Sequence, residues 1–297
     1  MIKKAAMIAI IGRPNVGKST LTNALVGEKI AIVTNKPQTT RNRIFGIVNA
    51  GDTQLVLMDT PGFHKARNRL GDYMVKVVNE SVADVEAAAL IVEPVPVIGT
   101  QESLLIEKLK QSDAPAILVI NKIDTVEKEK LLEVIAVYSA AYEFDAVIPV
   151  SAKTGDGVDI LKEELCKYAI ESPALFPEDM TTDQPEKQVC AEIIREKLLL
   201  CLEREVPHGT AVEITRFTER DNEIIDLEAT IYCEKQSHKG MIIGKHGAML
   251  KKVGELARHD IEEYMGTKVY MQTWVKVKEN WRDSVSQLRN FGYDEKQ

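Results

Sequence analysis

Aromatic residues and cysteines are both scarce in this sequence. Aromatic side chains make up 5% of the 297 residues, and no two of the four cysteines form a C-x-x-C pair. This spacing disfavours a zinc site or a disulfide framework and favours a reducing cytoplasm. No stretch approaches the ~20 uninterrupted apolar residues of a membrane-spanning helix. We therefore expect a cytoplasmic protein without a transmembrane segment.

The N-terminal stretch MIKKAAMIAIIGRPN has the basic start and apolar run of a signal peptide. Because the run leads directly into a glycine-lysine motif, a buried first strand is the better interpretation. The composition, 44% apolar and 28% charged, is that of a soluble globular protein, and the length favours two domains.

The net charge of −7 is unevenly distributed along the chain. Residues 230–297 contain 12 Lys and Arg against 9 Asp and Glu, which gives +3, and the remainder carries −10. An acidic body with a mildly basic C-terminal section indicates a polyanion-binding end. Ordinary surface variation would explain the difference if charge were the only clue.

Short apolar runs alternate with amphipathic stretches in the first 170 residues. The runs are apolar on both faces, as strands buried within a parallel sheet are. Stretches such as ESLLIEKLKQS separate most of them, and this alternation predicts an α/β fold with a mostly parallel sheet. The predicted strands are residues 7–12, 54–59, 89–93, 116–121 and 146–151.

A change of pattern follows these strands. The segment ESPALFPEDMTTDQPEK (171–187) is rich in proline and acid and predicts a linker, although its LFP could dock onto either domain. A long helical pattern, two alternating strands, the sequence GMIIGKHG, a helix over about 248–264 and a further strand come next. We predict two domains, residues 1–172 and 187–297, joined by a linker at 173–186.

A phosphate-binding loop is predicted at residues 12–19, GRPNVGKS, which fits G-x-x-x-x-G-K-[ST] between a strand and a helix. Such a loop turns its backbone N–H groups toward phosphate oxygens, while Lys18 adds positive charge and the Ser19 hydroxyl can ligate Mg²⁺. A merely structural glycine turn is disfavoured by this context. The predicted contacts are Gly12, Arg13, Pro14, Asn15, Val16, Gly17, Lys18, Ser19 and Thr20.

The motif DTPG, Asp59, Thr60, Pro61 and Gly62, ends another apolar strand. Asp59 can hold Mg²⁺ through water, and the Gly62 N–H can contact a γ-phosphate, whereas a capped turn is the alternative. Many GTPases place a water-orienting glutamine next, but Phe63 stands here and cannot hydrogen-bond a water. We therefore expect slow intrinsic hydrolysis.

Two further motifs indicate that the base is guanine. NKID (121–124) follows a third strand, and Asp124 is a bidentate acceptor for the two donors on the guanine edge. Asn121 can bridge neighbouring loops, and the stem of Lys122 can cover the base plane. The SAK sequence after the next strand, Ser151, Ala152 and Lys153, can direct a backbone N–H at the guanine O6.

A second binding surface is predicted around the G-x-x-G sequence at 244–247. Two glycines let a loop approach a sugar-phosphate backbone, and basic residues between them attract phosphate. Ile242 and Ile243 would anchor the preceding helix and form a floor for bases. Trp274 and Trp281 are either stacking or core residues, and Lys251 and Lys252 are equally well explained as solvated. The predicted RNA contacts are Lys239, Ile242, Ile243, Gly244, Lys245, His246, Gly247, Lys251 and Lys252.

These motifs carry three resemblances. The nucleotide motifs, in this order, resemble those of translation-factor-type GTPases over roughly residues 5–170. The helix–strand–strand–helix–helix–strand order around I-I-G-x-x-G resembles a type II KH domain, an α+β module that binds single-stranded RNA. GRPNVGKS, QTTRNRI, DTPGFH, NKID, SAK and GMIIGKHG together resemble the Era family of bacterial GTPases over nearly the whole chain.

The resemblance implies a GTPase that binds 16S ribosomal RNA near its 3′ end and assists 30S subunit assembly. It also implies peripheral association with the inner face of the membrane, and we expect a monomer. One departure is VEPVPVIG (92–99), where the family more often has an Asp-rich turn.

The resemblance also implies individual roles in catalysis. A switch-loop threonine, Thr39 or Thr40, would bind Mg²⁺, and the position of Thr40 before Arg41 resembles the TTR motif of related GTPases. Asn15 resembles the residue that holds K⁺ in GTPases without the glutamine. The expected catalytic residues are Lys18, Thr40, Gly62 and Asn15, and the expected Mg²⁺ ligands are Ser19, Thr40 and Asp59.

Two other functions fit parts of the sequence. A nucleotide-independent RNA-binding protein with a vestigial phosphate loop is disfavoured because the nucleotide motifs are intact. A GTPase with separate RNA-modification chemistry ranks last, because no Cys/His or cofactor constellation supports that chemistry.

Overall fold

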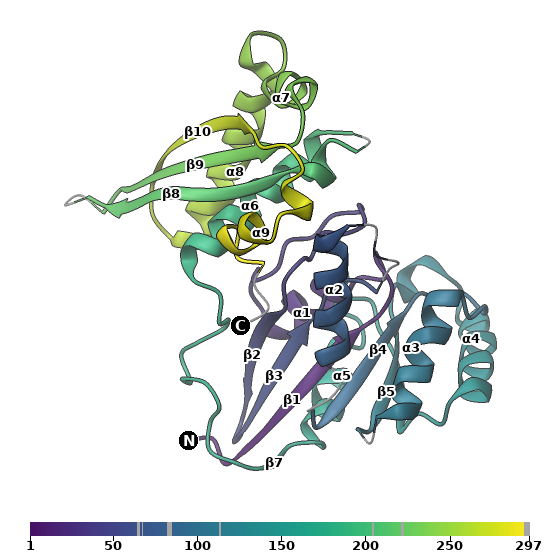
Figure 1. Ribbon diagram of the computed structural model, residues 1–297. Helices are drawn as coiled ribbons and strands as arrows, with labels where there is room; N and C mark the ends of the chain where they lie inside the picture. The colour runs from purple at the N-terminus through teal and green to yellow at the C-terminus, as the bar shows by residue number, and fades with distance from the viewer. Residues whose placement is uncertain are drawn as a thin grey trace. The chain divides into compact units, whose positions relative to one another are not determined.

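The computed structural model describes residues 1–63, 66, 68–81, 85–112, 114–203, 205–220 and 223–293. His64 of the DTPGFH motif lies outside the described residues. The chain forms two compact units (Figure 1). The first comprises Met1–Ala31, Thr40–Arg67 and Gly71–Asp183, and the second comprises Ile32–Thr39, Asn68–Leu70 and Gln184–Gln297.

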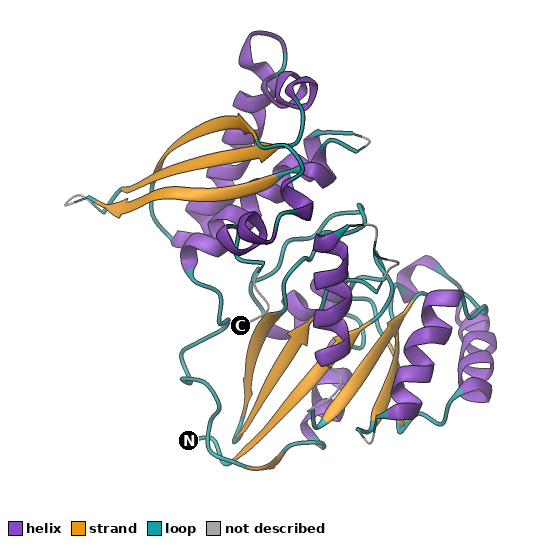
Figure 2. Cartoon of the chain, in the orientation of Figure 1, coloured by secondary structure: helices purple, strands orange, loops and turns teal. Residues whose placement is uncertain are grey.

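A mostly parallel sheet forms the centre of the first unit (Figure 2). Its strand order is β2-β3-β1-β4-β5-β6. Strand β2 is antiparallel to β3, and the short β7 is antiparallel to the start of β1. The predicted α/β fold with a mostly parallel sheet is confirmed. The strands are β1 (Lys4–Ile11), β2 (Ile44–Ala50), β3 (Thr53–Asp59), β4 (Ala87–Val92), β5 (Ala116–Ile120), β6 (Ala146–Pro149) and β7 (Ile170–Glu171).

Helices cover both faces of this sheet because successive strand side chains point to opposite sides. Ile8 and Ile10 of β1 belong to the cluster that includes α1 and α5, whereas Ala9 and Ile11 belong to the cluster that includes α3 and α4. The helices of the first unit are α1 (Lys18–Val26), α3 (Thr100–Gln111), α4 (Lys128–Ala141) and α5 (Val158–Cys166), with the 3₁₀ turn η1 (Ile123–Thr125). Helix α2 (Arg69–Glu80) belongs to the first unit from Gly71 onward.

Strand β2 is not among the predicted strands. Its sequence, IFGIVNA, contains a glycine and an asparagine, which lower strand propensity, and it follows the polar KPQTTRN loop. Tertiary pairing overrides this weak local signal, because β2 pairs with β3 along its whole length, from Ile44 opposite Asp59 to Ala50 opposite Thr53.

The segment that follows β7 lies along the first unit. Gln54 accepts hydrogen bonds from the backbone N–H groups of Leu175 (2.8 Å) and Phe176 (2.9 Å). The Phe176 ring lies 5.8 Å from that of Phe45. The LFP sequence within the predicted linker is thus docked on the sheet of the first unit.

The second unit contains a three-stranded sheet in the order β10-β9-β8. Strand β9 is antiparallel to β8 and parallel to β10. Buried side chains of α6 and α8 form its core with the strands. The elements are α6 (Glu186–Cys201), β8 (Ala211–Glu219), β9 (Ile225–Cys233), α7 (Gln236–Ile243), α8 (Ala248–Met265), β10 (Val269–Val277) and α9 (Val285–Asn290), with 3₁₀ turns η2 (Pro207–Gly209), η3 (Lys245–Gly247) and η4 (Trp281–Asp283).

Candidate functional site

The GRPNVGKS loop joins the carboxyl end of β1 to the start of α1. Gly17 has a φ of 98°, and a Cβ there would lie 2.3 Å from the Asn121 amide nitrogen, so this position requires glycine. The buried Lys18 Nζ donates to the carbonyls of Gly12 and Arg13, at 3.2 Å each. The loop thus curls around the lysine amine, with the N-terminus of α1 beside it.

Oxygen atoms from three separate segments meet next to this loop. The Ser19 Oγ lies 2.6 Å from Asp59 Oδ2 and 2.7 Å from Thr40 Oγ1. Asp59 Oδ1 is buried and has no hydrogen-bond partner among the described residues. Hydroxyl and carboxylate oxygens are the ligands that Mg²⁺ prefers, and the unpaired buried oxygen leaves a coordination position. The residues present therefore fit the ion.

The two candidate switch threonines lie in different surroundings. The Thr39 Oγ1 lies 2.7 Å from Thr34 Oγ1 and donates to the Lys36 carbonyl at 2.7 Å. Its hydroxyl is therefore engaged within its own loop, whereas the buried Thr40 hydroxyl faces Ser19. The sequence leaves Thr39 and Thr40 as alternatives, and in the structure the Thr40 hydroxyl is the one beside Ser19.

Burial perturbs both charges of this site. Burial lowers the pKa of the Lys18 amine, although attraction to Asp59 opposes the shift. Burial likewise raises the pKa of the Asp59 carboxyl, although Lys18 and the Ser19 hydrogen bond oppose it. A phosphate beside Lys18 and a cation beside Asp59 would favour the charged form of each group.

The DTPG loop is held against the phosphate loop. The Thr60 hydroxyl donates to the Ile10 carbonyl at 2.8 Å, and the Phe63 N–H donates to the Gly12 carbonyl at 3.2 Å. The half-buried Phe63 ring packs against the core cluster of α3 and α4, with Lys108 Nζ 5.0 Å from its centroid. This side chain is apolar and packed, so it does not position a water.

The guanine motifs are connected to the phosphate loop by side-chain hydrogen bonds. Asn121 donates to the Val16 carbonyl at 2.8 Å and accepts from the Ala152 N–H at 3.0 Å. The Ser151 hydroxyl donates to Asp124 Oδ1 at 2.7 Å, which orients the carboxylate that would read the base. Lys153 is exposed. The structure brings NKID, SAK and the phosphate loop to one edge of the sheet.

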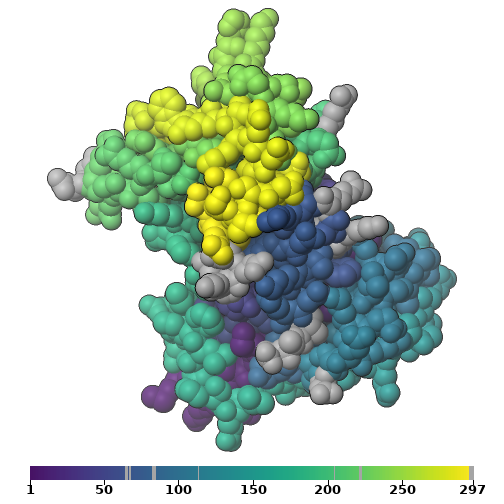
Figure 3. Space-filling view, viewed as in Figure 1, coloured from purple at the N-terminus to yellow at the C-terminus, as the bar shows by residue number. Residues whose placement is uncertain are grey.

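The G-x-x-G sequence forms the tight connection between α7 and α8. Gly244 has a φ of 72°, and a Cβ there would lie 2.6 Å from the Met249 Cβ, so this turn requires glycine. Lys245 and His246 are exposed between the two glycines, while Ile242 is buried and Ile243 half-buried. The yellow-green segment around this turn lies on the surface of the second unit (Figure 3).

The remaining predicted RNA contacts lie on the two flanking helices. Lys239 is half-buried on α7, and Lys251 and Lys252 are exposed on α8, where Lys251 Nζ lies 3.8 Å from a Glu255 carboxylate. The structure separates the two tryptophans, which the sequence does not. Trp274 is 56% exposed, whereas Trp281 is buried and donates its indole N–H to the Gly209 carbonyl at 3.0 Å.

One site residue is absent from the predicted set. Glu93, directly after β4, forms ion pairs with Arg13 of the phosphate loop and Lys122 of NKID. The signal in the sequence is an acid at the carboxyl end of a parallel strand, in the VEPVPVIG segment. Its partners are distant in sequence, so the pattern alone does not identify them.

In the described part of the chain, no three His, Cys, Asp or Glu side chains form a cluster that could hold a metal ion. None of the helices over the described residues is long and apolar enough to cross a membrane. All four cysteines, each within the described ranges, are free thiols.

A phosphate loop, a DTPG loop and NKID at one edge of a parallel sheet define a GTPase domain, and a G-x-x-G turn between two helices beside a three-stranded sheet defines a KH domain. A family model described as a 50S ribosome-binding GTPase matches residues 7–122, and a KH-domain model matches residues 205–282.

The relatives span both domains. GTPase Era of Ruminiclostridium cellulolyticum is 50% identical over 293 residues, 99% of this chain and 98% of the relative. GTPase Era of Caldanaerobacter subterraneus subsp. tengcongensis is 49% identical over 294 residues, 99% of each chain. The chain belongs to the Era family of GTPases, which confirms the resemblance and the predicted GTPase and KH folds.

Solved structures agree with this assignment. A crystal structure of Era in complex with MgGDPNP and nucleotides 1506–1542 of 16S ribosomal RNA is 34% identical, with a TM-score of 0.94 over 99% of both chains. A crystal structure of an Aquifex aeolicus Era variant bound to GDP·AlF4⁻ has the same identity and TM-score, over 98% of this chain and 99% of that one.

Proposed function

We propose that this protein is a slow GTP-hydrolysing switch that binds single-stranded 16S ribosomal RNA near its 3′ end and assists 30S subunit assembly. The observation that carries the GTPase part is the convergence of Ser19, Thr40 and Asp59 beside Lys18. The relative whose whole chain is similar, its KH domain included, was solved with 16S ribosomal RNA. We therefore prefer the small subunit to the 50S subunit in the family model's description.

We assign each nucleotide contact to a chemical role. Lys18 and the N–H groups of the phosphate loop hold the phosphates, and the Gly62 N–H donates to the γ-phosphate. Ser19, Thr40 and Asp59 would hold Mg²⁺, which neutralises charge on the β- and γ-phosphates. Asp124 reads the guanine edge, and a backbone N–H of the SAK sequence is directed at the guanine O6. Arg13, Pro14, Val16, Thr20 and Lys153 complete the proposed contacts.

Hydrolysis needs a substitute for the missing glutamine. Asn15 lies exposed in the phosphate loop with a φ of 67°, and its amide oxygen is a hard donor suited to a monovalent cation. We propose that K⁺ held at Asn15 supplies positive charge at the phosphates, and that backbone groups orient the attacking water.

Rates of GTP hydrolysis in KCl and in NaCl at equal ionic strength test this proposal. We expect K⁺ to raise the wild-type rate about tenfold. Asn15→Ala should abolish the difference between the two salts while GDP binding is retained, and exposed Asn290→Ala is the matched control. Fast hydrolysis in NaCl without a partner, unchanged by K⁺, would show that the proposal is wrong.

The RNA part of the proposal rests on the second unit. Exposed Lys245 and His246 occupy the turn between α7 and α8, and Lys239, Lys251 and Lys252 supply further charge on the two helices. Ile242 and Ile243 anchor α7, and Gly244 and Gly247 allow a close backbone approach. We propose residues 1–172 as the GTPase domain, 173–186 as the linker and 187–297 as the RNA-binding domain.

Fluorescence anisotropy with a short RNA from the 3′ end of 16S ribosomal RNA tests this part. The protein should bind the single strand tighter than the same sequence in a duplex, and the GTP-analogue and GDP forms should differ in affinity. Lys245→Ala should weaken binding about fivefold. Lys268→Ala removes an exposed charge paired with Glu262 and serves as the control. Equal binding of single strand and duplex would contradict the proposal.

We further propose a cytoplasmic monomer, a fraction of which associates peripherally with the inner face of the membrane. The free thiols suit a reducing compartment, and the basic section at residues 230–297 suits an anionic lipid surface. Flotation with vesicles containing anionic lipid, against neutral vesicles, tests the membrane fraction. Sedimentation of the purified chain tests the monomer.

A further inference from the structure

The VEPVPVIG segment (92–99) begins at the end of strand β4, and its one acid, Glu93, lies at a junction of the nucleotide loops. Strand β4 ends at Val92, whose carbonyl accepts a hydrogen bond from the Asn121 N–H at 2.8 Å. This bond places Glu93 directly beside NKID. The Glu93 side chain is 23% exposed, so its carboxylate is largely withdrawn from water.

The two oxygens of Glu93 bind two different cations. Oε2 accepts from Arg13 Nη2 and Oε1 accepts from Lys122 Nζ. Lys122 Nζ also donates to the Asn15 carbonyl of the phosphate loop at 2.6 Å. One carboxylate thus connects the phosphate loop at Arg13 with the lysine whose stem would cover the base.

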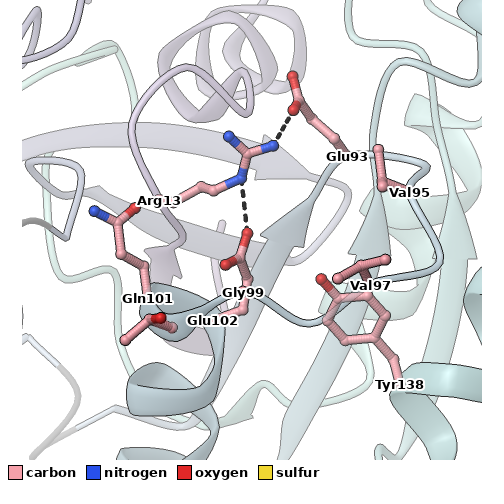
Figure 4. Close-up of a pocket in the computed structure, with 9 residues that line it drawn as sticks. Arg13, Glu93, Val95, Val97, Gly99, Gln101, Glu102 and Tyr138 are labelled. Atoms are coloured by element: carbon pink, nitrogen blue, oxygen red, sulfur yellow. Dashed lines mark hydrogen bonds and ion pairs between the residues drawn. The ribbon is translucent and has the colours of Figure 1, made fainter.

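Arg13 is held from its other side by a second carboxylate. Its Nε lies 2.7 Å from Glu102 Oε1 on α3, and the Glu102 side chain is 8% exposed (Figure 4). A cavity of about 510 Å³ lies beside this pair, lined in part by Val95, Val97 and Tyr138. The arginine is therefore fixed by two acids at the edge of an open space.

The electrostatic environment keeps Glu93 ionised. Burial raises the pKa of its carboxyl, but the hydrogen bond from Lys122 and the charge of Arg13 outweigh this, and the pKa lies below its ordinary value. The carboxylate is therefore charged throughout the neutral range. A hydrogen bond between two charged groups is shorter and stronger than one between neutral groups.

We propose that Glu93 is a positioning residue for guanine-nucleotide binding, which holds Lys122 over the base and ties it to the phosphate loop. The inference rests on the proposed GTPase function. Because Lys122 would contact the base equally in the ground state and in the transition state, Glu93 acts on affinity and leaves the chemical step unchanged.

Glu93→Gln tests this role, because it keeps the shape of the side chain and removes its charge. The KM for GTP and the Kd for GDP should both rise about tenfold, with kcat at saturating GTP within about twofold of the wild type. Glu93→Asp retains a carboxylate and should recover part of the affinity. Glu107→Gln, an exposed acid on α3 that pairs with Lys110, is the matched control and should change neither constant.

The affinities of two nucleotides that differ in their base distinguish a positioning role of Glu93 from a role in base recognition. Asp124 reads the exocyclic amine of guanine, whereas the Lys122 stem covers the plane of any purine. Glu93→Gln should therefore weaken GDP and inosine diphosphate by the same factor. A changed ratio between the two nucleotides would contradict the proposal.

A double-mutant cycle tests whether Glu93 acts on nucleotide affinity through its contact with Lys122. Glu93→Gln and Lys122→Met should be non-additive in GDP affinity, because each removes the same contact, while Glu107→Gln, outside this ion-pair network, and Lys122→Met should be additive. Wild-type affinity in Glu93→Gln, or additivity with Lys122→Met, would overturn the inference. Failure of the wild type to bind GDP would instead overturn the proposed function.

Discussion

At the scale of single residues, the proposed recognition of guanine depends on the carboxylate of Asp124. Its Oδ1 accepts from the Ser151 hydroxyl, so the carboxylate is oriented before the base arrives. Pre-orientation of this kind lowers the entropy lost on binding.

Asp124→Asn tests this role of the carboxylate. An amide presents one acceptor and one donor, whereas guanine offers two donors and xanthine replaces one of them with an acceptor. GTP affinity should fall about 1000-fold and XTP affinity should rise, measured by competition with a fluorescent nucleotide. Asp145→Asn, in an exposed loop before β6, should leave both affinities unchanged. Retained preference for GTP would contradict the assignment.

At the scale of elements, one buried side chain makes several of the hydrogen bonds that hold the docked segment after β7. Gln54 is fully buried on β3, and its amide nitrogen also donates to the Phe176 carbonyl at 3.0 Å. Both ends of the amide are therefore used to hold the segment.

Gln54→Leu removes those bonds at nearly constant volume. Two backbone N–H groups lose their acceptor, and the free energy of unfolding should fall by about 2–3 kcal/mol. Urea denaturation measures this loss, and GDP affinity should be unchanged in the folded variant. Exposed Gln111→Leu is the control for the same chemical change. Equal stability of Gln54→Leu and the wild type would show that the docked segment contributes little.

The turn between α7 and α8 requires a glycine at position 244. In Gly244→Ala, the added methyl meets Met249 and the left-handed backbone disfavours any Cβ, so the turn must shift. RNA affinity should fall about tenfold, while GTP hydrolysis without RNA stays at the wild-type rate. Gly266→Ala, also at positive φ but without a neighbour within 4 Å of the added Cβ, separates backbone strain from this clash. Wild-type RNA binding in Gly244→Ala would contradict this.

At the scale of the whole molecule, the net negative charge of the chain repels RNA, which is also negatively charged. The chain carries −7, yet the predicted RNA contacts include four lysines. Their effect is local, because at physiological salt charges interact over only about 8 Å. The salt dependence of affinity therefore reports the number of local phosphate contacts.

We expect the logarithm of RNA affinity to fall with the logarithm of KCl concentration with a slope of about −3, from about −0.7 for each of four lysines on a single strand. Lys251→Ala should reduce the magnitude of the slope by about 0.7, and Lys268→Ala should not. An unchanged slope in Lys251→Ala would assign that lysine to solvent.

The sequence predicts most of the fold because its strongest signals are local. Strands β1, β4 and β5 are buried on both faces, so apolar runs reveal them. The composition of strand β2 gives only a weak signal for a strand. The strand forms because it pairs with β3. Trp281 and Trp274 look alike in sequence, and only the packing of Trp281 against Phe291 and Tyr293 separates them.

The candidate nucleotide site is likewise only partly predictable from the sequence. Motif spacing predicts Lys18, Asp59 and Asp124, because each lies in a fixed pattern at or after the end of a strand. It does not distinguish Thr39 from Thr40, since the loop conformation decides which hydroxyl faces Ser19. It also misses Glu93, which lies 80 positions from Arg13 and meets it only through the strand order of the sheet.

The segment after β7 pairs with the outer edge of strand β2, and this pairing affects self-association. The Thr181 carbonyl accepts from the Ile47 N–H at 2.9 Å, and Thr182 forms an antiparallel bridge with Gly46, so the outer edge of β2 is already paired. A chain cut before residue 172 would present that edge bare, as a template for the strand of another copy. A GTPase fragment that ends after Asp183 should remain dispersed, whereas one that ends at Lys167 should oligomerise.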